Sequence, residues 1–149
     1  MSTPGRFAPQ DLHFEERIRA SFARQKAMAL IGASLGPVAA GRVEVRLPFR
    51  DELTQQKGYV HGGIVGMIAD TACGYAAYSL MPASASLVTV EYKINILSPG
   101  RGDLAARGEV VKSGRSLTVA RAEVYAGDVH VASMQQTLMM LADTPDSVE

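Results

Sequence analysis

An isolated aspartate is the residue best suited to chemistry in this sequence. Asp70 is the only charged side chain between Ile64 and Tyr78, a stretch rich in Gly, Ala and larger apolar residues. Burying an unpaired carboxylate costs on the order of several kcal/mol, and carboxylates kept in such surroundings are enriched at functional sites. The structural alternative is an aspartate that bonds a neighbouring backbone group or hydroxyl, such as that of Thr71, or pairs with a distant Lys or Arg.

Two adjacent glycines immediately precede this stretch. Gly62 and Gly63 leave backbone N–H groups uncovered, and the positive end of a helix starting there could hold a carbonyl oxygen or a developing oxyanion. A tight turn into the helix is the alternative interpretation. The chain has no G-x-S-x-G serine motif for His61 to serve, so we expect His61 to orient the loop through a backbone hydrogen bond.

The spacing of these groups has a consequence for assembly. Gly62 and Asp70 are eight residues apart, which is roughly 12 Å along one helix. Groups acting on one carbon lie within about 3–3.5 Å of it, so these two cannot share a reacting carbon within one chain. Two helices lying antiparallel across a twofold axis would bring them together. If both residues are catalytic, the sequence predicts a dimer with two equivalent interface sites.

Composition excludes several other classes of protein. The 149 residues fit one domain, and 15 basic against 15 acidic side chains argue against a nucleic-acid-binding module. A single cysteine, Cys73, and three scattered histidines favour neither disulfides nor a metal site. Asp70 near the middle of residues 64–81 argues against a membrane span, and the first residues lack an apolar signal segment, so we expect a cytoplasmic protein.

The remaining pattern predicts the elements that position these residues. A long buried helix is expected at about Gly62–Leu80, and short turns between the later strands indicate an antiparallel sheet around it. Because this helix is apolar almost all round, we expect a second subunit to cover its other side. We expect a tail at 1–10, one domain over 11–142 and a frayed end at 143–149. Within the domain we expect a helix from Asp11 to about Gly32 and strands at 42–49, 88–96, 104–112, 116–126 and 129–141.

One segment makes the sequence recognisable. QQKGYVHGGIVGMIADTACGYAAYSL, together with the strands after it, resembles the hotdog-fold acyl-CoA thioesterases of the phenylacetate-degradation (PaaI-like) branch of the 4-hydroxybenzoyl-CoA thioesterase superfamily. The resemblance runs from about Ala27 to Leu141. It combines a Gln six residues before HGG with an Asp seven residues after its last glycine. It implies an α+β hotdog fold, in which an antiparallel sheet of about five to six strands wraps around a long central helix.

The resemblance also assigns roles within a dimer whose sheets join edge to edge, with dimers pairing again into tetramers. Asp70 corresponds to the acid that activates water or attacks the thioester, and Gly62 to the glycine whose N–H polarises the carbonyl. Gln55 helps to place substrate or water from the same subunit as Gly62. Thr89 orients water from the subunit that supplies the acid. Some relatives carry a threonine one turn after the acid, where this chain has Gly74.

The coenzyme A contacts are implied less specifically. The region 98–116 resembles the part of relatives that touches coenzyme A, although ordinary solvated turn charges are the alternative. Met67, Ala72 and Tyr75 are expected to line a tunnel for the acyl group. The candidate substrate- and coenzyme A-binding residues are His61, Gly63, Arg101, Lys112, Arg115 and Ser116.

Hydrolysis of an acyl-CoA thioester is therefore the expected function, with no metal and no cofactor beyond the coenzyme A of the substrate. A non-catalytic acyl-CoA-binding module is the main alternative, although such a module has no need of a buried carboxylate. A hotdog dehydratase or hydratase is disfavoured because its His-Phe-Pro or Asp-plus-His signature does not occur. A purely structural dimer is the remaining interpretation. Acyl group, pathway and the choice between base and nucleophile stay open.

Overall fold

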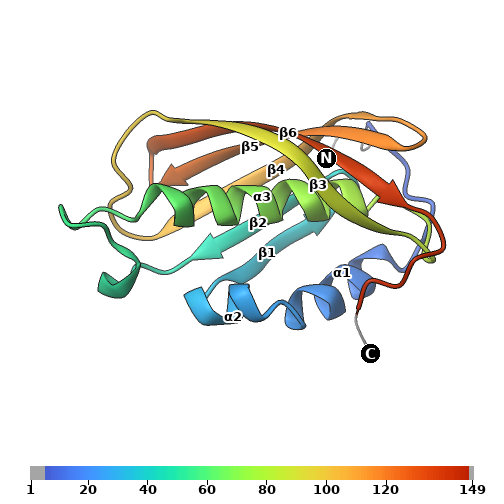
Figure 1. Ribbon diagram of the computed structural model, residues 1–149, viewed down its shortest axis with the longest axis horizontal. Helices are drawn as coiled ribbons and strands as arrows, with labels where there is room; N and C mark the ends of the chain where they lie inside the picture. Colours follow the sequence, from blue (N-terminus) through green and yellow to red (C-terminus); the bar gives the residue numbers. More distant parts are fainter. Residues whose placement is uncertain (1–5, 148–149) are drawn as a thin grey trace, which may run out of the picture.

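A long helix, α3 (Gly62–Tyr78), lies across one face of a curved six-stranded antiparallel sheet in the computed structural model (Figure 1). The structure describes residues 6–147. The strand order is β1-β2-β4-β5-β6-β3. The other elements are α1 (Phe14–Ala23), α2 (Lys26–Ile31), β1 (Ser34–Ala39), β2 (Arg42–Leu47), a short 3-10 helix (Asp51–Leu53), β3 (Ser86–Ile96), β4 (Leu104–Ser113), β5 (Leu117–Ala126) and β6 (Val129–Leu141). The expected α+β fold is confirmed.

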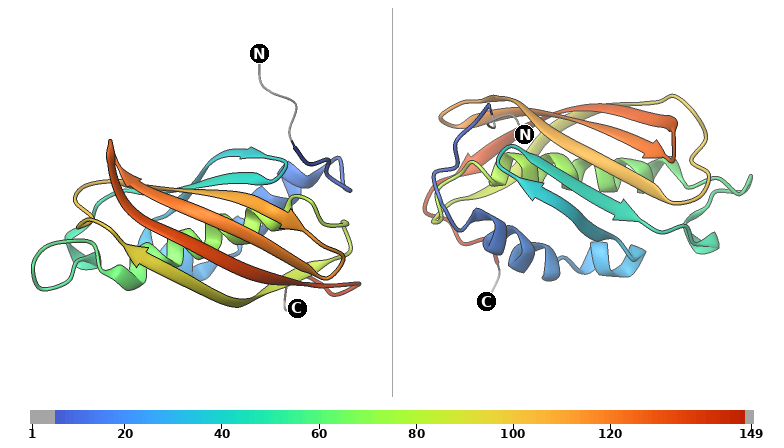
Figure 2. Two further views of the ribbon diagram at one scale, coloured as in Figure 1. Left: turned by 90° about the horizontal axis from the view of Figure 1, so that it is seen from above. Right: turned by 180° about the vertical axis from the view of Figure 1, so that it is seen from behind.

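The small residues of α3 let the sheet approach its backbone. Gly108 of β4 faces the Ala72 carbonyl so closely that an added Cβ would lie 2.3 Å from that oxygen. Only glycine fits such an approach. The apolar character of α3 therefore reflects burial against the sheet, which wraps over it when seen from above (Figure 2). The expected helix at about Gly62–Leu80 is confirmed and ends two residues earlier, at Tyr78.

The first forty residues differ most from the sequence expectation. The single helix expected from Asp11 is two helices, because Gln25 adopts an extended conformation between them. Strand β1 was not expected, since Gly36 and Pro37 interrupt its alternation. It lies at the sheet edge and contains an irregularity in its pairing with β2, where both residue types are tolerated.

Helix α1 packs against part of α3. The second subunit expected to cover α3 is therefore replaced in part by the N-terminal segment of the same chain. The Arg17 guanidinium donates to the carbonyls of Tyr78, the last residue of α3, and of Met81 and Pro82 just beyond it. It also lies 4.2 Å from the centre of the Tyr78 ring. In the views from the front and from behind, α1 lies below β1 and β2, which run between it and α3 in the picture (Figures 1 and 2).

The expected tail and frayed end lie partly outside the described residues. Within that range, Gln10 donates to the Leu80 carbonyl at 3.1 Å. Near the other end, Asp146 accepts hydrogen bonds from Ser21 and Arg24. None of the described helices has the length and apolarity that crossing a membrane requires.

Strand β3 changes which face its side chains occupy partway along. A bulge falls at Val90, between the pairs Thr89–Leu138 and Glu91–Thr137. The expected alternation placed Thr89 on the face opposite Tyr92. The extra residue instead turns Thr89 toward α3, on the same side as Tyr92. Bulges of this kind often re-aim a side chain beside an active site.

Candidate active site

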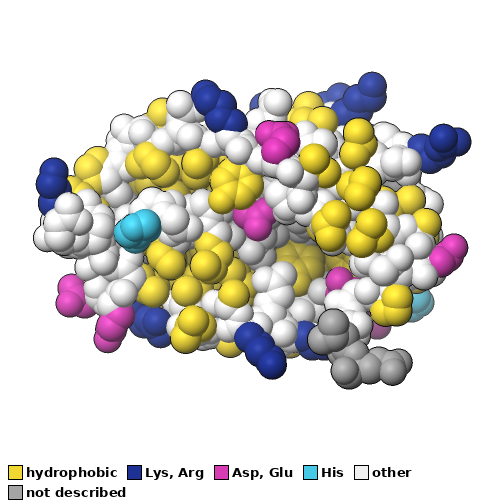
Figure 3. All heavy atoms as spheres, viewed as in Figure 1, with side chains coloured by type: hydrophobic (Ala, Val, Ile, Leu, Met, Phe, Trp, Pro, Cys, Tyr) yellow, Lys and Arg dark blue, Asp and Glu magenta, His cyan; other side chains and the backbone are white. Residues whose placement is uncertain are grey.

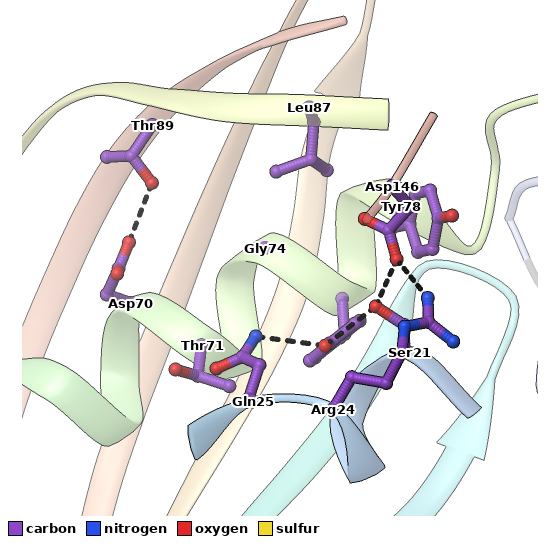
Figure 4. Close-up of a pocket in the computed structure, with 11 residues that line it drawn as sticks. Ser21, Arg24, Gln25, Asp70, Thr71, Gly74, Tyr78, Leu87, Thr89 and Asp146 are labelled. Carbon is purple, nitrogen blue, oxygen red and sulfur yellow. Dashed lines mark hydrogen bonds and ion pairs between the residues drawn. The ribbon is translucent and has the colours of Figure 1, made fainter. Parts of the chain in front are cut away.

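Asp70 lies in the middle of α3, half-buried and directed toward β3 (Figure 4). Its Oδ1 accepts hydrogen bonds from the Thr89 hydroxyl at 2.8 Å and from the Gln136 amide. Among residues 6–147, no donor bonds Oδ2 and no cationic side chain forms an ion pair with the carboxylate. The Thr71 hydroxyl donates instead to the Met67 carbonyl. Thr71 and a distant Lys or Arg are therefore not the partners of Asp70, and the hydroxyl that it bonds is that of Thr89.

Gln136 is the residue at this site that the sequence reasoning missed. It lies on β6, is fully buried and donates to both Asp70 and Thr89. The available signal was an amide at an inward position of an apolar strand, flanked two residues away by Met134 and Leu138. That signal becomes visible only when the register of β6 is known.

A cavity of about 290 Å³ opens beside Asp70, between α3, β3 and the N-terminal helices. Gly74 and Leu87 flank it one helical turn beyond the acid (Figure 4). Tyr75, expected beside the acyl group, lines this cavity, whereas Ala72 packs against Gly108 of β4. Met67, expected beside the acyl group, is not among the lining residues, which are Ser21, Arg24, Gln25, Asp70, Thr71, Gly74, Tyr75, Tyr78, Leu87, Thr89 and Asp146.

The far end of this cavity is polar. The Tyr75 hydroxyl accepts from the Gln25 amide at 2.9 Å and lies 3.0 Å from Ser21 Oγ. Ser21 and Arg24 both donate to the Asp146 carboxylate (Figure 4). Burial raises the pKa of the Tyr75 hydroxyl, and its hydrogen bonds only partly offset this. The hydroxyl therefore stays protonated at neutral pH.

The start of α3 forms a second polar site. His61 Nδ1 accepts the Gly63 N–H at 2.8 Å and so caps the helix. Gly62 is exposed, and its N–H has no hydrogen-bond partner among the described residues. Gln55 and Gly62 line a separate cavity of about 320 Å³. An unpaired N–H at a helix N-terminus suits a carbonyl oxygen or an anion.

The expected catalytic residues thus fall into two groups. Thr89 joins Asp70, and Gln55 joins Gly62, but the groups line different cavities. Their helical spacing corresponds to roughly 12 Å. The two groups therefore do not meet within one chain. Hydrophobic side chains gather around a hollow on the face where α3 runs between β3 and α1 (Figure 3).

The candidate coenzyme A contacts are also divided between the two ends of α3. Arg101 stacks on Tyr59 with its guanidinium 4.5 Å from the ring centre, in the loops beside Gly62. Lys112, Arg115 and Ser116 are exposed at the β4–β5 turn. Thr118, just after this turn, pairs with Leu138 of β6, and Leu138 also pairs with Thr89. The turn therefore lies on the side of the molecule that carries Thr89 and Asp70, away from Gly62.

Cys73 is an unsuitable nucleophile despite its place one turn from Asp70. Burial raises the pKa of its thiol, and the nearby Asp70 and Glu123 carboxylates raise it further. The thiolate that would be the nucleophile is therefore suppressed. Within residues 6–147, no three His, Cys, Asp or Glu side chains are grouped as metal ligands would be.

Comparisons of the sequence and of the fold with known proteins point to the same family. Residues 57–133 match the family described as Thioesterase superfamily. A thioesterase family protein from Silicibacter pomeroyi is 48% identical, with a TM-score of 0.85 over 87% of this chain and 98% of that one. A conserved protein from Pseudomonas aeruginosa is 32% identical, with a TM-score of 0.76 over 78% and 94%. The PaaI protein of the E. coli phenylacetic acid degradation operon, 21% identical, shares the fold with a TM-score of 0.81 over 88% and 95%.

Proposed function

Because this chain belongs to the thioesterase superfamily and has its hotdog fold, we propose that it hydrolyses acyl-CoA thioesters at sites shared between two subunits. The observation that carries the proposal is the carboxylate of Asp70. It borders a cavity, has one oxygen held by neutral donors, and has no ion-pair partner among residues 6–147. Such a group can take a proton from water or attack a carbonyl carbon.

The edge of the sheet supports the dimer. Strand β3 has β6 on one side and no strand on the other among the described residues. Its exposed apolar side chains include Val88, Val90, Tyr92 and Ile96, and the exposed fraction of Val90 is 53%. An uncovered edge with apolar side chains is a template for pairing with another chain. We therefore place a second copy against β3.

The contacts of β3 with α3 determine the register of that pairing. Asp70 lies beside Thr89, and Gly62 lies beside Ile96, whose side chain would be 4.0 Å from an added Cβ. A complete site requires that Asp70 of one chain lie opposite Gly62 of the other. The β3 residue beside Asp70, Thr89, must then face the β3 residue beside Gly62 in the second chain, Ile96. An antiparallel pair of β3 strands does this when the twofold axis lies midway between positions 89 and 96, near residues 92–93.

The mechanism follows from this arrangement. The thioester carbonyl oxygen accepts the N–H of the partner subunit's Gly62, where the helix dipole favours the charge that develops there. Asp70 takes a proton from water, and the water oxygen attacks the carbonyl carbon. The tetrahedral intermediate then expels the coenzyme A thiolate, which receives the proton. Direct attack by Asp70 is the second route: it breaks the C–S bond, expels the coenzyme A thiolate and gives a mixed anhydride, which water hydrolyses to the free acid and the Asp70 carboxylate.

The two cavities suggest where the substrate lies. The acyl group enters the cavity between Gly74 and Leu87, and the partner subunit's Gln55 helps to place the thioester. In the proposed dimer, two sets of basic side chains lie at the same end of each site, where they can bind the phosphates of coenzyme A. These side chains are Lys112 and Arg115 of the β4–β5 turn, and the partner subunit's Arg101.

Turnover of a panel of acyl-CoA thioesters tests the proposal. We would compare acetyl, hexanoyl, palmitoyl, benzoyl and phenylacetyl-CoA with wild type, Asp70→Asn and the matched control Asp128→Asn, whose side chain is exposed in the β5–β6 turn. Asp70→Asn should lower kcat at least about 10²-fold, as loss of a general base does, while Asp128→Asn stays at wild-type activity. Binding that raises Tm without turnover by wild type would instead indicate a non-catalytic acyl-CoA-binding module.

A further inference from the structure

Strand β6 places one amide in an otherwise apolar row beneath α3. Ala132, Met134, Gln136 and Leu138 alternate along the face directed at the helix, and all four are buried. The exposed fraction of Gln136 is 0%. A polar side chain at such a position needs partners that compensate for its lost contact with water.

The partners of Gln136 are the two side chains already assigned to the acidic half of the site. Its Nε2 donates to Thr89 Oγ1 at 2.8 Å and to Asp70 Oδ1. Thr89 Oγ1 donates in turn to the same Oδ1, at 2.8 Å. The side chains of Gln136, Thr89 and Asp70 thus form a triangle of three hydrogen bonds. Gln136 uses both of its amide N–H groups in it, and Asp70 Oδ1 accepts two of the three bonds.

The orientation of the amide is fixed by the charge that it meets. An ionised carboxylate only accepts hydrogen bonds, so the reversed amide would set Gln136 Oε1 against Asp70 Oδ1. The observed orientation leaves Oε1 buried without a hydrogen-bond partner among the described residues. An orphaned buried acceptor lowers stability. The amide group therefore donates hydrogen bonds to Asp70 and Thr89 while its own oxygen is left without a donor. Such a local loss of stability is expected at functional sites.

The bulge in β3 makes the triangle possible. Gln136 pairs with Tyr92 and Leu138 pairs with Thr89, with the extra residue Val90 between the two pairs. This shift turns the Thr89 side chain to the same face as Gln136. Two adjacent strands and the helix then meet at one carboxylate oxygen, while Oδ2 is left without a partner within residues 6–147.

We propose that Gln136 is a positioning residue for thioester hydrolysis, whose amide fixes the Asp70 carboxylate so that Oδ2 faces water and substrate. This inference rests on the proposed function, because it needs Asp70 to act on the thioester. Gln136 itself lies beneath the carboxylate and acts through it. Its removal should impair the chemical step more than substrate binding.

The substitution Gln136→Met removes both donors and the orphaned acceptor while keeping similar length and volume. It should lower kcat about 10- to 100-fold, the range found when groups that orient reactive residues are lost. KM should stay within about twofold, since uniform substrate binding is untouched. The Tm should equal or exceed that of wild type. Gln135→Met is the matched control, because Gln135 is adjacent and exposed on the opposite face.

A double-mutant cycle separates positioning from a general structural effect. In the Asp70→Asn background, Gln136→Met should cause no further loss of residual activity, because residues that act as a unit are not additive. An equal fold-loss in both backgrounds, a kcat within about twofold of wild type, or a variant that fails to fold would each overturn the proposal. If wild type hydrolyses no thioester, the proposed function fails first. If wild type is active and loses this activity in Asp70→Asn, the double-mutant cycle tests only the positioning role of Gln136.

Discussion

The two oxygens of the Asp70 carboxylate have different surroundings, and this difference is the central feature at the scale of residues. Oδ1 is bonded by Thr89 and Gln136, whereas Oδ2 accepts no hydrogen bond from residues 6–147. A carboxylate anchored through one oxygen presents the other in a fixed direction. Because productive geometry tolerates little displacement, the neutral donors matter to the proposed reaction alongside the acid itself.

Cys73 offers a residue-scale test of the packing next to that acid. Its thiol is buried and its pKa is raised, so less thiolate exists at any given pH than in a free cysteine. We predict that native protein reacts with Ellman's reagent at pH 8 far more slowly than protein unfolded in guanidinium. The unfolded chain should release one equivalent, for its single cysteine. Rapid stoichiometric labelling of native protein would mean that α3 separates from the sheet.

At the scale of elements, α3 carries residues of both halves of the proposed site and holds these halves apart. Its first N–H is the proposed oxyanion donor, and its middle carries the acid. The rigid rise of a helix keeps them roughly 12 Å apart. Gly74 then leaves the groove beyond Asp70 open, since the chain has no side chain there. Where some relatives carry a hydroxyl, this chain leaves space, which the proposed function assigns to the acyl group.

Gly74→Ala tests that interpretation of the groove. An added Cβ would lie 3.9 Å from Leu138 and 4.0 Å from Leu87, which is ordinary contact, so the variant should fold. Replacing a helical glycine should raise the free energy of unfolding by roughly 0.5–1 kcal/mol. We predict a lower kcat/KM for acyl groups that fill the cavity and little change for acetyl-CoA. Gly66→Ala, on the same helix outside this cavity, should stabilise without that selectivity. Unchanged chain-length preference in Gly74→Ala would place the acyl group elsewhere.

Sequence patterns predicted most of these elements, and the failures have physical causes. The long helix and the later strands follow from apolar periodicity and turn residues. Strand β1 was missed because its Gly36 and Pro37 are tolerated only at a sheet edge. Asp70 was found because it is the only charge in its stretch. Gln136 was missed because its role depends on strand register and on the bulge at Val90, which pairwise sequence spacing does not reveal.

At the scale of the whole molecule, a single chain is an incomplete enzyme in this account. The Gln55–Gly62 half and the Asp70–Thr89 half line different cavities. The uncovered β3 edge offers the surface on which a second copy would complete both. The distance argument from the sequence and the exposed edge in the structure therefore support the same twofold assembly.

We expect two variants to disable one half of the proposed site each without disturbing the fold. Asp70→Asn removes the acid. Gly62→Pro removes the proposed oxyanion donor at the first helical residue, where proline is well tolerated. The preceding residue His61 has φ −57° and ψ 135°, a conformation that suits a residue before proline. Each variant alone should be a folded dimer with kcat at least about 10²-fold below wild type.

Co-expression of these two variants with different affinity tags is the most direct test of the shared site. A heterodimer has one site with both intact halves and one site with neither. Random pairing therefore predicts that the mixture regains about one quarter of wild-type activity, and the purified heterodimer about one half. Recovery at that level would establish that Gly62 and Asp70 act across the interface. A purified heterodimer as inactive as its parents would contradict the account.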